Sequence, residues 1–152
     1  MNPQFKPLVQ KSLAYLAIRS RSELEIKQYL AKKTTDVDLI QEVIQYLQHH
    51  QLINDLNFGT LWAESRVRRL KGDIQIIQEL KFKGLSTDLR HQIIENIDQA
   101  LWLESMATIL AKKHHKFEHL TGYPQKAKIY QILQAAGYSS KLIDAFLRGR
   151  VE

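Results

Sequence analysis

The stretch QELKFKGLSTDLRHQII, residues 78–94, contains the end of one predicted helix and the beginning of the next. Gly84 lies at the end of the first helix, where glycine can adopt the left-handed backbone conformation. Ser86 follows, and serine is a residue type that accepts hydrogen bonds from the free N–H groups at a helix start. Leu89 and Ile93 then lie on one face of the second helix. The stretch therefore predicts two helices joined by a short turn.

The same pattern occurs at two other places in the chain, which indicates an internal repeat. Leu30, Leu80 and Leu133 are 50 and 53 residues apart, and matching residue types follow each of them. Four positions later the residues are Thr34, Gly84 and Gly137, and six positions later they are Asp36, Ser86 and Ser139. Nine positions later they are Leu39, Leu89 and Leu142. Thirteen positions later they are Val43, Ile93 and Phe146, and fourteen positions later Ile44, Ile94 and Leu147. A cap followed by this apolar spacing fits one buried stripe on an equivalent helix in each repeat.

A third helix is expected before each of these helix pairs, and strand-like alternation is absent. These preceding helices are predicted near residues 8–19, 57–70 and 99–119, the last of them ending at Gly122. The paired helix after Ser22 begins with a capping box, because Glu25 stands three residues later. The sequence thus predicts an all-α chain of about nine helices. Three tandem three-helix repeats, at residues 1–54, 55–98 and 99–152, would form an elongated, curved array.

Composition sets limits on the class of protein. The 152 residues suffice for one domain of ordinary size or for a short array of smaller units. No stretch is long and apolar enough to span a membrane, and the N-terminal residues lack the apolar core of a signal peptide, so we expect a cytoplasmic protein. The chain contains no cysteine, which excludes disulfides and thiolate metal sites.

The sequence contains none of the common catalytic or phosphate-binding motifs. It has no glycine-rich phosphate loop and no G-x-S-x-G turn. His115 and His119 have the spacing by which one helical face can offer two metal ligands. No HExxH frame surrounds them and no third ligand is evident, so solvated or partly packed histidines explain them as well. We predict a protein that is not an enzyme, with no catalytic residue, no cofactor and no bound metal.

Positive charge is concentrated in two zones of a nearly neutral chain, whose net charge is +6. The middle zone contains Arg66, Arg68, Arg69, Lys71, Lys81 and Lys83, and the C-terminal zone contains Lys112, Lys113, Lys116, Lys126, Lys128, Lys141, Arg148 and Arg150. Such zones suit a polyanion or an acidic protein partner. All of these residues except Lys141 are candidate contacts for a partner or for DNA. The plainer alternative is that the charges only solvate helix surfaces.

Four segments of the chain together carry a family likeness: IRSRSELEIKQYLAKK, VIQYLQHHQLINDLNF, RVRRLKGDIQIIQELKFKGL and KIYQILQAAGYSSKLIDAFL. In this order and spacing they resemble the RecX family, whose members regulate the RecA recombinase. The likeness covers roughly residues 8–148. Two positions depart from the family pattern. Gly59 stands where the family usually has alanine, and Thr34 replaces a turn residue that is often glycine, so both departures concern turns and packing.

The resemblance implies a fold of three tandem three-helix repeats, in agreement with the repeat found in the sequence. It also implies a regulatory protein that binds along a RecA filament on single-stranded DNA and hinders strand exchange and ATP turnover. We expect a monomer whose partners are RecA and single-stranded DNA, and no membrane. Two other functions stay open: a stand-alone helical DNA-binding protein, and an interaction scaffold that does not contact nucleic acid.

Overall fold

The computed structural model describes the backbone of residues 2–151 and the side chains of residues 2–149. Every secondary-structure element in this part of the chain is a helix, which confirms the predicted all-α class. The α-helices are α1 (Phe5–Ile18), α2 (Glu23–Ala31), α3 (Val37–His49), α4 (Asp55–Arg68), α5 (Asp73–Phe82), α6 (Thr87–Glu95), α7 (Gln99–Lys112), α8 (Gly122–Ala135) and α9 (Ser140–Val151).

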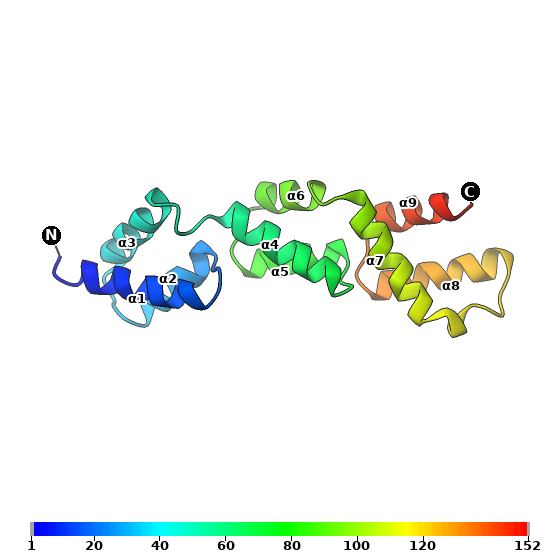
Figure 1. The fold of residues 1–152 in the computed structure, drawn as a ribbon, viewed down its shortest axis with the longest axis horizontal. Coiled ribbons are helices and arrows are strands. Elements are labelled where there is room, and N and C mark those ends of the chain that lie inside the picture. Colours follow the sequence, from blue (N-terminus) through cyan, green and yellow to red (C-terminus); the bar gives the residue numbers. More distant parts are fainter. Residues whose placement is uncertain (1, 152) are drawn as a thin grey trace.

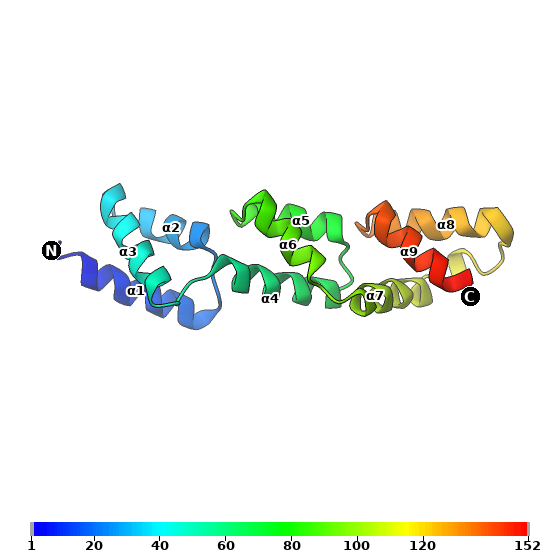
Figure 2. The ribbon, with the colours of Figure 1, turned by 90° about the horizontal axis from the view of Figure 1, so that it is seen from above.

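The helices form three groups that follow one another along the long axis of an elongated molecule (Figures 1 and 2). We call α1–α3 the first unit, α4–α6 the second unit and α7–α9 the third unit. Within each unit the three helices pack on one another, and the packing of α4 against α7 joins the second unit to the third. The repeat boundaries predicted at residues 54 and 98 stay a prediction, although α4 and α7 begin close to them.

The matched leucines occupy equivalent buried sites, as the repeat predicts. Leu30, Leu80 and Leu133 are all completely buried. The predicted helix starts are also present: the side chains of Asp36 and Ser86 accept hydrogen bonds from N–H groups in the first turns of α3 and α6. Short-range sequence signals therefore determine where the paired helices begin.

Gly84 and Gly137 end α5 and α8 in the left-handed conformation, with φ of +88° and +92°. The following residues, Leu85 and Tyr138, donate backbone hydrogen bonds to the carbonyls of Leu80 and Leu133. This pattern closes the last turn of a helix and places glycine where other residues are strained. The prediction of positive φ at both glycines is confirmed.

Alanine at either glycine should destabilise the fold, by roughly 1 kcal/mol from the backbone conformation alone. Gly84→Ala should cost more than Gly137→Ala, because its Cβ would lie 2.6 Å from the Cβ of Leu24, whereas the nearest atom at Gly137 is 3.1 Å away. Gly122→Ala is the matched control, since it shares a positive φ but has open space around it. Urea unfolding should rank Gly84→Ala as the most destabilised. Equal losses in all three variants would contradict the packing argument.

The first helix of the third unit is shorter than predicted. The expected helix over residues 99–119 ends at Lys112, and a single 3-10 turn follows at His114–Lys116. Phe117, whose helical spacing suggested the longer helix, is buried, but this turn brings it into the core. Gly122 was expected to end that helix and instead begins α8.

The described residues form two separate hydrophobic cores. One belongs to the first unit and includes Ile26, Leu30 and Ile44. The other is continuous through the second and third units, from Phe58 in α4 to Phe146 in α9. The second and third units are therefore packed as one body, and the first unit has a core of its own.

Backbone hydrogen bonds reinforce the junction of the second and third units. The N–H of Gly72 donates to the carbonyl of Ala136 and the N–H of Ile74 to the carbonyl of Gly137, both at 3.0 Å. The buried carboxylate of Asp73 accepts a hydrogen bond of 2.7 Å from the N–H of Ser139. The start of α5 is thus bound to the turn between α8 and α9.

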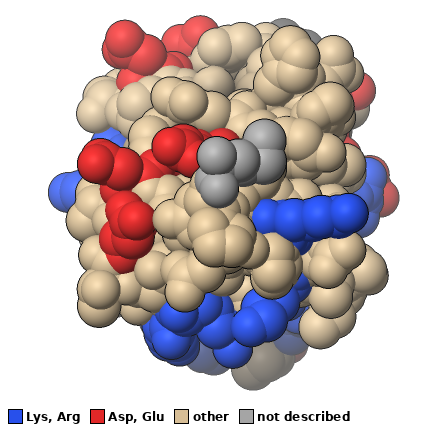
Figure 3. Space-filling view, turned by 90° about the vertical axis from the view of Figure 1, so that its left-hand side faces the viewer, with Lys and Arg blue, Asp and Glu red and all other residues tan. Residues whose placement is uncertain are grey.

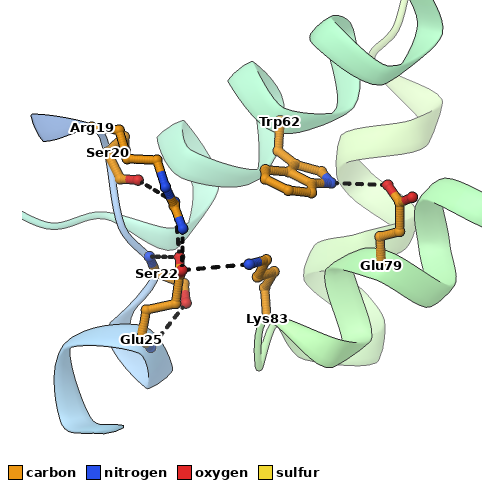
Figure 4. A network of polar contacts seen from close by, with 7 residues as sticks. All are labelled: Arg19, Ser20, Ser22, Glu25, Trp62, Glu79 and Lys83. Carbon is orange, nitrogen blue, oxygen red and sulfur yellow. Dashed lines mark hydrogen bonds and ion pairs between the residues drawn. The ribbon is translucent and has the colours of Figure 1, made fainter. Parts of the chain in front are cut away.

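Polar contacts prevail at the junction of the first and second units (Figure 4). Glu25 of α2 pairs with Arg19 at 2.6 Å and with Lys83, just after α5, at 3.4 Å. The N–H of Glu23 donates a hydrogen bond of 2.8 Å to the carboxylate of Asp55, the first residue of α4. Burial of Asp55 raises the pKa of its carboxyl group, although this hydrogen bond acts in the opposite direction.

Candidate polyanion-binding surface

The end of α4 places the middle basic zone around a tight turn. Arg66 and Arg68 lie in the last turn of the helix, and Arg69 follows it. Leu70 adopts a left-handed conformation with φ of +66°, which permits the N–H of Lys71 to bond the carbonyl of Arg66 at 3.1 Å. This is the same helix ending that glycine provides elsewhere in the chain, here imposed on a leucine. Arg69 and Lys71 consequently lie immediately before and after the residue at which the chain turns away from the helix.

Arg66 is engaged within the protein. Its guanidinium group donates two hydrogen bonds to the carboxylate of Glu79 on α5, at 2.9 and 2.7 Å, and the indole of Trp62 donates a third at 3.1 Å. Partial burial acts to raise the pKa of Glu79, but these donors and the charge of Arg66 hold that pKa below its ordinary value of 4.5. The bidentate pair fixes α4 against α5.

Glu79→Gln should therefore destabilise the protein near neutral pH more than in acid. A carboxylate whose pKa is lowered by folding stabilises the fold above its unfolded pKa, and that contribution is lost as the pH falls through the folded pKa. Urea unfolding of the wild type and the variant at about pH 7 and about pH 3 measures this. The difference in free energy of unfolding should shrink at the lower pH, below the ordinary value of 4.5. An unchanged difference would contradict the role of the ion pair.

Lys83 and Lys81 differ in their surroundings. Lys83 is half-buried between Glu25 and the ring of Trp62, with its ammonium nitrogen 4.8 Å from the ring centre. Lys81 is exposed and forms no ion pair within the described residues. A hollow of about 530 Å³ lies at this junction, and its lining includes Glu25 and Glu79 as well as Lys83. Two carboxylates against one ammonium group make the lining of this hollow negative, so it is not the candidate site for an anion.

A second hollow, of about 280 Å³, brings residues of the two basic zones together. Arg69 and Lys71 come from the turn after α4, and Lys112 and Lys113 come from the end of α7. No acidic residue lines the hollow, and none of its four cationic side chains forms an ion pair in the described part of the chain. We call this feature the basic hollow. It gathers four of the candidate residues around one space.

The remaining candidates are distributed over the third unit. Lys116 is exposed in the turn after α7, and Arg68 is exposed at the end of α4. Lys126 and Arg148 line another hollow, of about 290 Å³, together with Asp144. The remaining candidate with a described side chain is Lys128 on α8, whose ammonium nitrogen lies 3.4 Å from the amide oxygen of Gln131. Lys141 of the C-terminal zone, which is not among the candidate contacts, is exposed on α9. Arg150 lies outside the described side chains.

Charge is also segregated at the end of the molecule that carries the N-terminus, which counts of charged residues do not reveal. Figure 3 views the molecule along its long axis from the end that carries the N-terminus. Lysine and arginine side chains gather along the lower side of this view, and aspartate and glutamate gather at its upper left. This end of the molecule therefore presents basic and acidic regions on different sides.

The meeting of Arg69 and Lys71 with Lys112 and Lys113 was not anticipated from the sequence, where the two pairs belong to separate zones. Both pairs lie at or just after the end of the first helix of a unit, α4 or α7, and those two helices pack on each other. An alignment of the first helices of the repeats could have revealed the cluster, because it places both basic pairs at the same end of equivalent helices. Whether any of these residues contacts a partner stays a prediction.

Comparison with known proteins relates the chain to one family. A family model for RecX, its first three-helix domain, matches residues 9–47. A protein named Regulatory protein RecX from Bacillus pumilus is 31% identical over 140 residues, or 91% of this chain. One from Listeria monocytogenes is 34% identical over 136 residues, or 88% of this chain. The chain is therefore related to the RecX family. The resemblance inferred from the sequence is confirmed.

Solved RecX structures show the same fold. A crystal structure of RecX from Lactobacillus salivarius matches with a TM-score of 0.85 and 24% identity, and the match covers 96% of both chains. The curated relatives are longer: this chain spans 53% of the Bacillus pumilus protein and 50% of the Listeria protein, about half in each case. Within residues 2–151, no helix is long and apolar enough to cross a membrane.

Proposed function

We propose that the chain is a regulatory protein that binds the RecA filament on single-stranded DNA and lowers its recombinase and ATPase activities. The observation that carries this proposal is the relation to proteins named Regulatory protein RecX over about nine-tenths of the chain. The action on RecA is what membership of that family implies. The protein would act by binding rather than by catalysis.

The shape and charge of the molecule support this proposal. An elongated row of units can lie along a filament and contact more than one of its subunits (Figure 1). A filament on DNA offers phosphate groups and acidic protein surface, and cations attract both. The basic hollow supplies four such cations at one place, where the second and third units meet.

The ATPase activity of purified RecA on single-stranded DNA tests the proposal. Adding the protein should lower the steady-state rate of ATP hydrolysis in a concentration-dependent way, and strand exchange should slow in parallel. DNA binding without any effect on RecA would favour the stand-alone DNA-binding protein instead. An absence of effect on RecA and of binding to the RecA filament would overturn the proposal.

A charge reversal in the C-terminal zone should act mainly on association with the filament. The triple variant Lys112→Glu, Lys113→Glu and Lys116→Glu removes long-range attraction, so its association rate constant should fall at low salt and approach the wild-type value at higher salt. Arg69→Ala should instead speed dissociation and keep that effect in salt, because a guanidinium group makes close, directional contacts. Surface plasmon resonance on RecA–DNA filaments measures both rates. Wild-type rates in both variants would place the contact elsewhere.

A further inference from the structure

The hollow between the first and second units combines aromatic rings with carboxylates. We call it the aromatic hollow: Trp62 and Phe82 supply the rings, Glu25 and Glu79 supply the carboxylates, and three glutamines and Lys83 complete the lining of about 530 Å³. Burial acts to raise the pKa of Glu25, but hydrogen bonds from its neighbours hold that pKa below its ordinary value of 4.5, so the group is charged at neutral pH. Ring faces and carboxylates both attract cations. The hollow therefore suits a positive group on an apolar stem.

Lys83 occupies this place in the free protein, but it is held weakly (Figure 4). Its ammonium nitrogen lies 4.8 Å from the centre of the Trp62 ring and 3.4 Å from Oε2 of Glu25. The second distance exceeds the roughly 2.7–2.9 Å of a strong charge-assisted hydrogen bond. Arg19 binds the same carboxylate oxygen at 2.6 Å, so Glu25 would keep a cationic partner if Lys83 moved away. Lys83 is therefore a replaceable occupant of the hollow.

We propose that the aromatic hollow docks an arginine side chain of a partner polypeptide, which takes the place of Lys83 between Glu25 and Trp62. The negative lining is complementary to that side chain. A guanidinium group is more weakly hydrated than an ammonium group and stacks on aromatic faces, so arginine can displace a weakly held lysine. The partner group has the opposite charge to those that the basic hollow attracts, and the inference holds whether or not the partner is RecA.

The face of α5 beside the hollow indicates which residues flank that arginine. Ile74, Gln78 and Phe82 are spaced four residues apart and share this face. Ile74 is 57% exposed and Phe82 is 80% exposed, although both are apolar. Apolar neighbours of the docked arginine would cover these two side chains and remove them from water. We therefore expect a segment in which an arginine stands between apolar residues.

The fold itself does not require this combination of residues. Glu25 and Lys83 correspond in the repeat to Gln75 and Ala136, which lie together in the basic hollow at the next junction. Phe82 likewise corresponds to Ala135. The equivalent place between the second and third units thus lacks the carboxylate, the ammonium group and the ring. The charge and aromaticity of the aromatic hollow are specific to the sequence at the first junction.

Titration with the blocked peptide acetyl-Leu-Arg-Leu-amide, followed by proton–nitrogen NMR, tests this inference. The indole N–H of Trp62 donates to Glu79 and reports on the hollow, whereas Trp102, which is buried in the core, is an internal control. The peptide should shift the Trp62 signal and leave the Trp102 signal in place. The same peptide with citrulline, which resembles arginine without its charge, should bind about threefold to tenfold more weakly. Equal affinities, or an unmoved Trp62 signal, would overturn the proposal.

Variants of Lys83 and Glu25 should act in opposite directions. Lys83→Met removes the resident cation and should strengthen binding of the arginine peptide by about threefold to tenfold. Glu25→Gln removes a carboxylate and should weaken it by about twofold to fivefold. If the ion pair only held the two units together, both variants would weaken binding, and that result would refute the docking site.

Lys81→Met is the matched control, because it removes the same charge from an exposed residue of α5 that does not line the hollow. Its affinity for the peptide should stay within about twofold of the wild-type value, since solvent and salt screen an exposed charge. A gain equal to that of Lys83→Met would show long-range attraction alone and would sink the proposal. Circular dichroism and the Trp102 signal report whether each variant is folded. The titration contains no RecA, so its outcome is independent of the ATPase test.

Discussion

Replacement of Leu80 by alanine is expected to lower the free energy of unfolding by about 2–5 kcal/mol. Leu80 is completely buried in the core that the second and third units share. Removing three carbon atoms there loses apolar burial and leaves a cavity that the surrounding helices fill only in part. Because that core is continuous, the loss should weaken both units together.

Urea unfolding followed by far-UV circular dichroism measures this loss. Leu61→Ala is the control, since Leu61 lies on α4 of the same unit but is 61% exposed, and it should change stability by less than about 0.5 kcal/mol. Protection of first-unit amides from hydrogen exchange should change little in the Leu80 variant, because that unit has a separate core. A cost as small as that of Leu61→Ala would contradict the assignment of the core.

Gly72→Ala should separate the second and third units and cost at least as much as the upper part of the 1–3 kcal/mol range typical of overpacking. An added Cβ would lie 2.1 Å from the carbonyl carbon of Gly137 and 2.3 Å from the backbone nitrogen of Tyr138. These are backbone atoms, so no side-chain rotation relieves the clash. The φ of Gly72 is −80°, which alanine adopts freely, and the whole effect is therefore steric.

The clash should also break the hydrogen bonds from Gly72 and Ile74 to the α8–α9 turn. Hydrogen exchange at these two amides should accelerate in the variant, together with a loss of stability in urea. Gly149→Ala is the control, because nothing lies within 4 Å of its added Cβ. Alanine also has a higher helix propensity than glycine, so this change should not destabilise the helix. Stability equal to that of the control would show that the turn can shift at no cost.

Most of the fold could be predicted because its signals are local. The repeated leucines, the N-cap residues and Gly84 act within a few residues of their own positions, so they are legible without tertiary information. The helix expected over residues 99–119 was too long for the same reason. The spacing from Leu110 to Phe117 fits a helix, yet the chain leaves the helix after Lys112 and returns Phe117 to the core through a 3-10 turn.

The candidate site could be predicted only in part. The sequence identifies which residues are basic, but ion pairs across the fold decide which of them are free. Arg66 and Lys83 are neutralised by Glu79 and Glu25, which lie 13 and 58 residues away along the chain. The basic hollow depends on the packing of α4 against α7, and no single stretch of sequence specifies that packing.

The difference between the two junctions gives the array one stiff joint and one compliant joint. Turning the third unit against the second would tear a shared core and three hydrogen bonds that involve backbone groups. Turning the first unit would break the ion pair of Glu25 with Lys83 and the hydrogen bond from the N–H of Glu23 to the carboxylate of Asp55, and it would open no core. A partly exposed ion pair resists such a turn weakly, and salt weakens it further. Mechanically, the protein is a rigid rod of six helices with a three-helix arm that a curved partner can bend at little cost.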